Sequence, residues 1–187
     1  MGAALIELGD APAAWERVGF APDAAGEVVL GDARLRLTGR GGGILRIQSP
    51  DLTSPNPDGL PLQPSSRGLV PGRGLHPNGA SVVDHVVALT GSLGRTVAAL
   101  TGAGLELRRS TATMAFLRLG PTILEVVERG EDPPRLWGLV VVVPALEGLG
   151  PVVSAPKDAV QPGRRIATVS REAGLGTALA LMTPRRT

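Results

Sequence analysis

The sequence predicts an α+β fold built from three similar units, each in the order strand, helix and three further strands (βαβββ). This prediction rests on a repeated order of apolar periodicities, on helix-start signals after the first strand of each unit, and on glycines that separate the later strands. With 187 residues, the chain can form one well-buried domain or several small modules that share a core. The sequence has two Trp, two Phe and no Tyr, so its core must be mostly aliphatic.

The clearest unit covers residues 82–128. A strand is expected over residues 82–89, followed by Ser92 as the N-cap of a helix. The helix carries Leu93, Val97 and Leu100 on one side, the spacing of an amphipathic helix. Three short strands are then expected at residues 105–109, 113–119 and 122–128.

Residues 1–48 repeat this order in a shorter form. Asp10 is expected to cap a helix with Pro12 in its first turn and Trp15 inside it. In the third unit, the helix shrinks to a short helical stretch near Leu146. The strands expected in these two units are at residues 4–8, 27–30, 34–37, 44–48, 136–143, 165–170 and 177–182. We therefore expect an N-terminal unit (1–48), a connecting loop (49–81) and a domain of two units (82–187).

The connecting loop, residues 49–81, is rich in Pro, Gly and Ser and shows no apolar periodicity. Such a long connection within a compact protein is typically a binding lid or a disordered segment. We expect it to lack regular structure and to lie near the open side of the fold. Its apolar residues could tether it to the surface; they are Leu60, Leu62, Leu69 and Val70.

Charge and composition exclude several classes of function. The formal net charge is +2, Lys157 is the only lysine, and the arginines are scattered along the chain. We therefore expect neither nucleic-acid binding nor a membrane-binding patch. The absence of cysteine excludes disulfides and thiolate metal sites. With no signal-like start and no apolar run long enough to span a bilayer, the sequence favours a cytoplasmic protein.

The hairpin around Gly120 and Pro121 indicates where a site could lie. A two-residue turn would pair Phe116 with Glu125 and Arg118 with Ile123. One face of the hairpin would then be aliphatic and suited to pack under the helix; it comprises Leu117, Leu119, Leu124 and Val126. The other face would mix apolar walls with two opposite charges, as ligand cavities do.

His85 and Glu125 interrupt strand faces that are otherwise apolar. A buried ionisable group must be paired, hydrogen-bonded or metal-bound, so these two residues are the leading site candidates. Two simpler explanations stay open: an ion pair of Glu125 with Arg118, and a core histidine bonded to the backbone. Asp84 is expected on the opposite strand face, where it would pair locally.

Other polar residues are weaker candidates. His76 lies in a loop and could be a third ligand or an exposed, inert residue. Gln161 and Arg164 lie at a turn, where arginine could hold a carboxylate or phosphate bidentately or simply be solvated. The glycine runs at 39–43 and 72–74 lack the lysine and the helix of a phosphate-binding loop.

The motifs HPNGA, DHVV, FLRLGPTILEVVE, LWGL and AVQPGRRIAT, in this order and spacing, resemble an uncharacterised glyoxalase-like family. That family is part of the vicinal oxygen chelate superfamily, which includes glyoxalase I, extradiol dioxygenases and bleomycin-resistance proteins. The resemblance implies paired βαβββ modules that form a cupped mixed sheet, with a divalent metal (zinc, nickel, manganese or iron) on the concave face. It places His85 and Glu125 at two metal-ligand positions and Gly138 and Ala180, which cannot coordinate, at the other two.

The missing ligands could come from the first unit, from His76 or from the partner subunit of a homodimer. The candidates in the first unit are Glu7, Arg46 and Gln48. The resemblance implies a small-molecule-binding protein, either a metal-dependent lyase, isomerase or dioxygenase with Glu125 as the catalytic residue, or a metal-free sequestration or resistance-type protein. A purely structural module is the third alternative. The expected ligand-binding residues are Phe116, Arg118, Trp137, Gln161 and Arg164.

Overall fold

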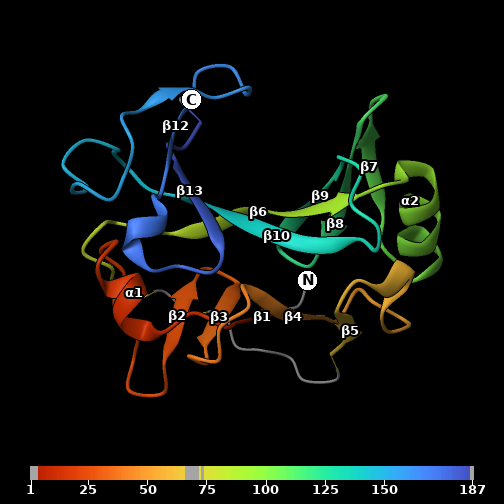
Figure 1. Ribbon diagram of the computed structural model, residues 1–187, viewed down its shortest axis with the longest axis horizontal. Helices are drawn as coiled ribbons and strands as arrows, with labels where there is room; N and C mark the ends of the chain where they lie inside the picture. The colour runs from red at the N-terminus through yellow and green to blue at the C-terminus, as the bar shows by residue number, and fades with distance from the viewer. Residues whose placement is uncertain (1–3, 66–71, 73, 186–187) are drawn as a thin grey trace.

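The computed structural model describes residues 4–65, 72 and 74–185, which form two sheets (Figure 1). The N-terminal sheet has the order β2-β3-β1-β4-β5, with β1 (Ala4–Leu8), β2 (Glu27–Leu30), β3 (Ala33–Leu37), β4 (Ile44–Ser49) and β5 (Leu62–Pro64). The C-terminal sheet has the order β11-β12-β13-β10-β6-β9-β8-β7. Its strands are β6 (Val82–Thr90), β7 (Leu107–Ser110), β8 (Met114–Leu119), β9 (Thr122–Glu128), β10 (Arg135–Val142), β11 (Lys157–Asp158), β12 (Arg165–Thr168) and β13 (Ala178–Met182). The helices are α1 (Pro12–Glu16), α2 (Leu93–Gly102) and the 3₁₀ turns η1 (Pro57–Gly59) and η2 (Arg171–Ala173).

The C-terminal sheet consists of two modules related by approximate twofold symmetry. In the first module, β6 pairs parallel with β9, and β9, β8 and β7 form an antiparallel meander. In the second, β10 pairs parallel with β13, and β13, β12 and β11 repeat the meander. The modules join through the antiparallel pair β6 and β10. The predicted α+β class and the mixed sheet of paired modules are therefore confirmed.

Only the first module has its helix. The helical stretch predicted near Leu146 is absent, and residues 143–156 form bends and turns. Gly148 and Gly150 explain this, because their φ angles of 76° and 91° are incompatible with a right-handed helix. Ser92 does occupy the N-cap position of α2, but its side chain makes no capping bond. Instead, the Glu128 carboxylate accepts a hydrogen bond from the Leu93 amide at 3.2 Å.

The N-terminal sheet keeps the predicted element order but pairs its strands differently from a module. β1 lies between β3, to which it is parallel, and β4, to which it is antiparallel. The burial pattern explains this position, since Ala4, Leu5, Ile6 and Leu8 are all buried. A strand buried on both faces is favoured at the centre of a sheet.

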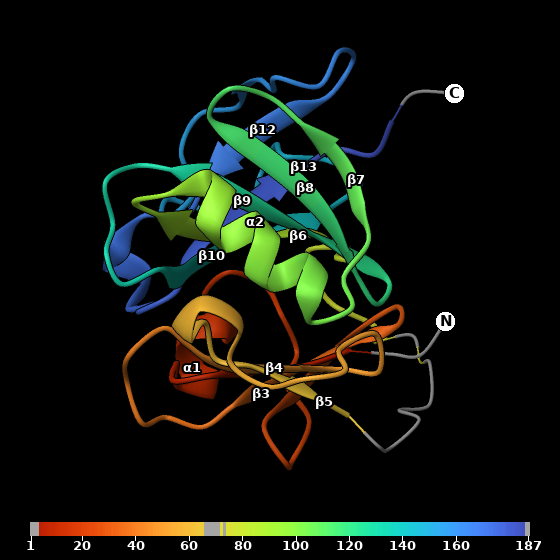
Figure 2. The same cartoon turned by 90° about the vertical axis from the view of Figure 1, so that its right-hand side faces the viewer.

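The two sheets share one apolar core. On the C-terminal sheet, Val86, Leu139 and Val141 belong to the same buried cluster as Ile6 and Ile47 of the N-terminal sheet. Figure 2 shows the N-terminal sheet below the C-terminal sheet, with α2 along the side of the latter. The N-terminal sheet and α2 both cover the convex side of the C-terminal sheet, so its concave face stays open (Figure 1). Among the described residues, no helix is long and apolar enough to cross a membrane.

The prediction that residues 49–81 lack regular structure is wrong in part, because they contain η1 and β5. Leu60 and Leu62 are fully buried and tether this stretch, whereas Leu69 and Val70 lie outside the described residues. Asp58 in η1 forms an ion pair with Arg95 of α2. The described part of the connection that carries these contacts therefore packs on the convex side, and not at the open side where it was expected.

Candidate functional site

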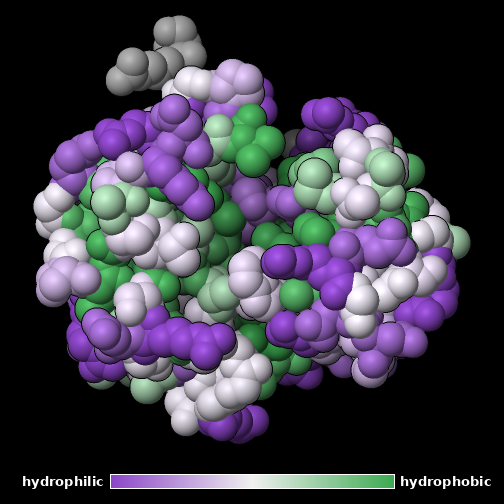
Figure 3. Space-filling model, turned by 45° about the horizontal axis from the view of Figure 1, so that its top comes forward, coloured by the Kyte–Doolittle hydropathy of each residue, from purple (hydrophilic) through white to green (hydrophobic). Residues whose placement is uncertain are grey.

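The concave face of the C-terminal sheet forms a cleft of about 680 Å³. Its floor comes from β6, β9, β10 and β13, and the loop at Gly42–Gly43 of the N-terminal sheet borders it at one side. Most of the floor is aliphatic, with Val87, Val127 and Val140 as examples. In Figure 3 this face is hollowed between two lobes, and hydrophobic surface inside the hollow is interrupted by hydrophilic groups. The volume lies within the range of small-molecule sites.

The hairpin of β8 and β9 has the predicted register. Phe116 lies opposite Glu125, and Arg118 lies opposite Ile123. The predicted aliphatic face is completely buried and belongs to the same core as Leu93 and Leu100 of α2; its members are Leu117, Leu119, Leu124 and Val126. Since strand side chains alternate, Glu125 lies on the opposite face and lines the cleft.

The structure brings His85 and Glu125 together at the cleft floor. The Nε2 atom of His85 lies 3.2 Å from a Glu125 carboxylate oxygen, and its Nδ1 atom lies 2.8 Å from an Asp84 carboxylate oxygen. The other Asp84 oxygen accepts a hydrogen bond of 2.7 Å from the guanidinium of Arg164. Glu125, His85, Asp84 and Arg164 thus form a charged chain in which His85 lies between two carboxylates.

The prediction that Asp84 faces away from His85 is wrong because the strand contains a β-bulge. Val140 pairs with His85 and Val141 pairs with Val83, so Asp84 is the extra residue in β6. A bulge interrupts the alternation of side chains. Asp84 can therefore contact the ring of its neighbour, while Val83 stays buried in the core.

The surroundings of Asp84 favour its ionised form. Burial raises the pKa of the Asp84 carboxyl, but hydrogen bonds from His85 and Arg164 outweigh burial and hold this pKa below its usual value. Asp84 therefore supplies a fixed negative charge behind the histidine. That charge orients the ring through the contact with its Nδ1 atom.

The predicted ligand-binding residues are distributed unevenly around this site. Trp137 lines the cleft and is 41% exposed; it is the extra residue of a second bulge, between Leu136 and Gly138. Phe116 and Arg118 are half-buried on the Glu125 face of the hairpin but do not line the cleft. Glu125 contacts His85, so its burial does not require the alternative that the sequence left open, an ion pair with Arg118.

Gln161 and Arg164 lie behind the cleft floor. The Arg164 side chain is only 4% exposed and donates to Asp84, to Gln161 and to the carbonyl of Thr183. The sequence left open that Arg164 is simply solvated, and its burial excludes this explanation. Both residues support the charged chain and do not line the cleft.

The sequence analysis missed three arginines that line the cleft; they are Arg129, Arg135 and Arg171. Arg129 continues the alternation of Glu125 and Val127 along β9, so the pattern could have indicated it. Arg135 and Arg171 follow turns whose course the sequence does not reveal.

The residues present do not fit a divalent metal. The Nε2 atom of His85 and the Glu125 carboxylate could supply two ligands to a metal at the cleft floor, whereas Asp84 contacts the other ring nitrogen and does not line the cleft. Gly138 and Ala180, at the symmetric positions, line the cleft but have no donor side chains. Among the described residues, no group of three or more His, Cys, Asp or Glu could hold a metal ion. A structural or catalytic zinc typically has at least about three protein ligands.

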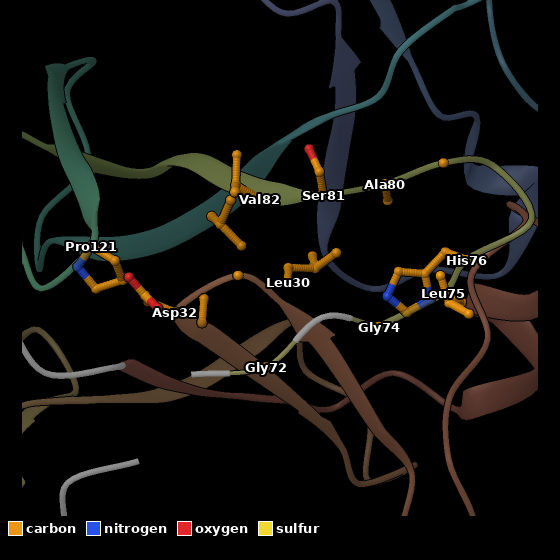
Figure 4. Close-up of a pocket in the computed structure, with 14 residues that line it drawn as sticks. Leu30, Asp32, Gly72, Gly74, Leu75, His76, Ala80, Ser81, Val82 and Pro121 are labelled. Carbon is orange, nitrogen blue, oxygen red and sulfur yellow. The ribbon is translucent and has the colours of Figure 1, made fainter. Parts of the chain in front are cut away.

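The candidate third ligands lie elsewhere. The Nδ1 atom of His76 accepts a hydrogen bond from the Ala21 amide, and its Nε2 atom lies 3.1 Å from the Val29 carbonyl. Figure 4 shows His76 in a second hollow, of about 990 Å³, between the two sheets. Glu7 and Arg46 form an ion pair of 2.8 Å within the N-terminal sheet, where Gln48 also lies. The described lining of the second hollow has no paired acid and base, so we regard the cleft as the functional site.

No protein-family model matches the chain, and no curated protein matches it in sequence. Solved structures similar to it include methylmalonyl-CoA epimerase from Mycobacterium tuberculosis, with 13% identity over 60% of this chain and 94% of that chain, and a TM-score of 0.49. Methylmalonyl-CoA epimerase from Streptomyces coelicolor in complex with 2-nitronate-propionyl-CoA is 15% identical over 56% of this chain and 97% of that chain, with a TM-score of 0.46. A hypothetical protein from Bacillus halodurans is 13% identical over 56% and 95% of the two chains, with a TM-score of 0.44.

What identifies the fold is the symmetric strand order, in which the first strand of each module pairs parallel with its fourth. The cleft lies on the concave face, as the resemblance to the vicinal oxygen chelate superfamily implies. The chain therefore has the glyoxalase-like fold of that superfamily, with an additional N-terminal sheet.

Proposed function

We propose that this protein binds a small, largely apolar molecule in the cleft and that it does so without a metal. The observation that carries the proposal is the contact of His85 with Glu125 and Asp84 at the floor of an aliphatic cleft. It supplies a polar contact point in apolar surroundings, the usual composition of a small-molecule site. The Glu125 carboxylate lines the cleft and can accept a hydrogen bond, so the matching ligand group is a hydrogen-bond donor such as a hydroxyl or an amine.

Fluorescence gives a direct test, because Trp137 lines the cleft whereas Trp15 is fully buried. The uncharged dye N-phenylnaphthylamine should bind the wild-type protein and change the emission of Trp137. Val127→Phe, which fills the cleft beside Glu125, should weaken binding about tenfold or more. The same substitution at Val160, which is 99% exposed, is the matched control and should have no effect. Equal binding by the wild type and Val127→Phe would refute the proposal.

The alternative from the sequence, a metal-dependent lyase, isomerase or dioxygenase with Glu125 as the catalytic residue, makes a different prediction. Titration calorimetry with zinc, nickel, manganese and ferrous iron should then show binding that His85→Ala abolishes. Because the described residues of the cleft offer few metal ligands, we expect no difference in metal binding between the wild type and His85→Ala. A homodimer, a cytoplasmic location and the absence of nucleic-acid partners stay predictions of the sequence.

A further inference from the structure

We propose that Arg129 and Arg171 bind an anionic group of the ligand. They lie at one end of the cleft, where β9 ends and where the loop leads into β13. The inference rests on the proposed function and adds the chemical class of the ligand. That class is an apolar molecule with a carboxylate, sulfonate or phosphate group at one end.

The first observation is the charge of the cleft lining. Among the described lining residues, Glu125 is the only carboxylate, and it contacts His85. The lining arginines are Arg129, Arg135 and Arg171. Arg135 forms an ion pair with Glu131, but the lining itself offers no carboxylate to the other two. An apolar cleft with excess positive charge favours an anionic ligand.

The second observation is where these arginines lie. Arg129 directly follows β9, and Arg135 begins β10 opposite Leu89, near the last residue of β6. Arg171 begins η2, in the segment that leads into β13, whose Ala178 pairs with Gly138 of β10. Antiparallel pairing of β6 with β10 brings these strand ends to the same side of the sheet.

The spacing along β9 gives the length of the ligand. Arg129 follows Glu125 by four residues, which corresponds to about 13 Å of extended strand. Between the two lies the apolar surface of Val127 and Leu89. A molecule with a donor group at one end and an anion at the other would therefore span about 13 Å.

The segment that carries Arg171 is held firmly in place. One oxygen of the buried Asp10 carboxylate accepts hydrogen bonds from the amides of Gly176 and Thr177, at 2.6 and 3.2 Å. Arg17 of the N-terminal unit donates to the carbonyl of Ala173 at 3.0 Å. Because these contacts fix the backbone, less ordering entropy opposes anion binding than on a free loop.

The experiment compares two dyes that differ by one charged group: N-phenylnaphthylamine, and anilinonaphthalene sulfonate, which carries an added anion. Both are titrated into the folded wild type and into Arg129→Gln/Arg171→Gln, with Arg109→Gln on exposed β7 as control. The double variant should bind the sulfonate about tenfold more weakly, with N-phenylnaphthylamine and the control unchanged. Added sodium chloride should weaken sulfonate binding to the wild type more than to the double variant.

Equal sulfonate affinity in the wild type and the double variant would overturn the inference while leaving the proposed function intact. A lack of dye binding to any of these proteins would instead refute the proposed function. Displacement of the sulfonate dye by inorganic phosphate alone, at the same total ionic strength, would show a site for a free anion and would also overturn the inference.

Discussion

Replacing Asp84 by Asn should destabilise the protein through the charged chain behind the cleft. The substitution keeps the side-chain shape but removes the charge that accepts hydrogen bonds from His85 and Arg164, at 2.8 and 2.7 Å. Breaking one side of a buried ion pair costs about 3–5 kcal/mol. Asp84 is 21% exposed, and Arg164 keeps its bonds to Gln161 and Thr183. We therefore expect a loss of about 2–3 kcal/mol in the free energy of unfolding at neutral pH.

The pH dependence of this loss distinguishes a charge effect from a packing effect. The pKa of Asp84 is lowered in the folded state, so its contribution is complete above the unfolded pKa of about 3.9 and disappears as pH falls through the folded pKa. Urea unfolding of the wild type and Asp84→Asn should therefore give curves that differ at pH 7 and converge in acid. Glu106→Gln, which removes an exposed ion pair with Arg108, is the control and should have little effect. If the two proteins still differed by the same free energy of unfolding at the lowest pH, the loss could not be assigned to the charge of Asp84.

Two further substitutions test how the cleft is built. Gly138→Ala would place a Cβ atom 2.5 Å from the Ala178 carbonyl oxygen, so we expect a loss of about 1–3 kcal/mol in urea unfolding, and stability equal to the wild type would disprove the close approach. Asp10→Asn should weaken the contact with the Gly176 amide and with the indole of Trp15, at 2.6 and 3.1 Å, and lower the thermal midpoint by several degrees. An unchanged midpoint would show that this carboxylate does not hold the loop.

The sequence predicted those parts of the fold that depend on local pattern. The turn at Gly120 and Pro121 set the register of the hairpin, and strict alternation then separated Glu125 from the buried face. Alternation alone was also enough to select His85. The roles of these residues in binding or catalysis stay predictions.

The sequence could not predict features that depend on one extra residue or on distant pairing. The bulges at Asp84 and Trp137 leave composition and periodicity almost unchanged, yet they decide which side chains reach the cleft. Likewise, Asp10 looked like a helix cap, but Ala11 occupies the N-cap position of α1, and the Asp10 carboxylate instead accepts hydrogen bonds from Trp15 and the distant Gly176. Only the tertiary structure brings that loop beside it.

The bond between Asp10 and Gly176 joins residues 166 positions apart, and it has a consequence for the order of folding. Contacts between such distant residues form late, because a long chain must be ordered before they are gained. Both βαβββ modules can assemble from nearer neighbours, whereas the wall of the cleft around Gly176 needs the first and last parts of the chain together. We therefore expect binding competence to appear after most secondary structure has formed, and during synthesis only once β13, which ends at Met182, has left the ribosome.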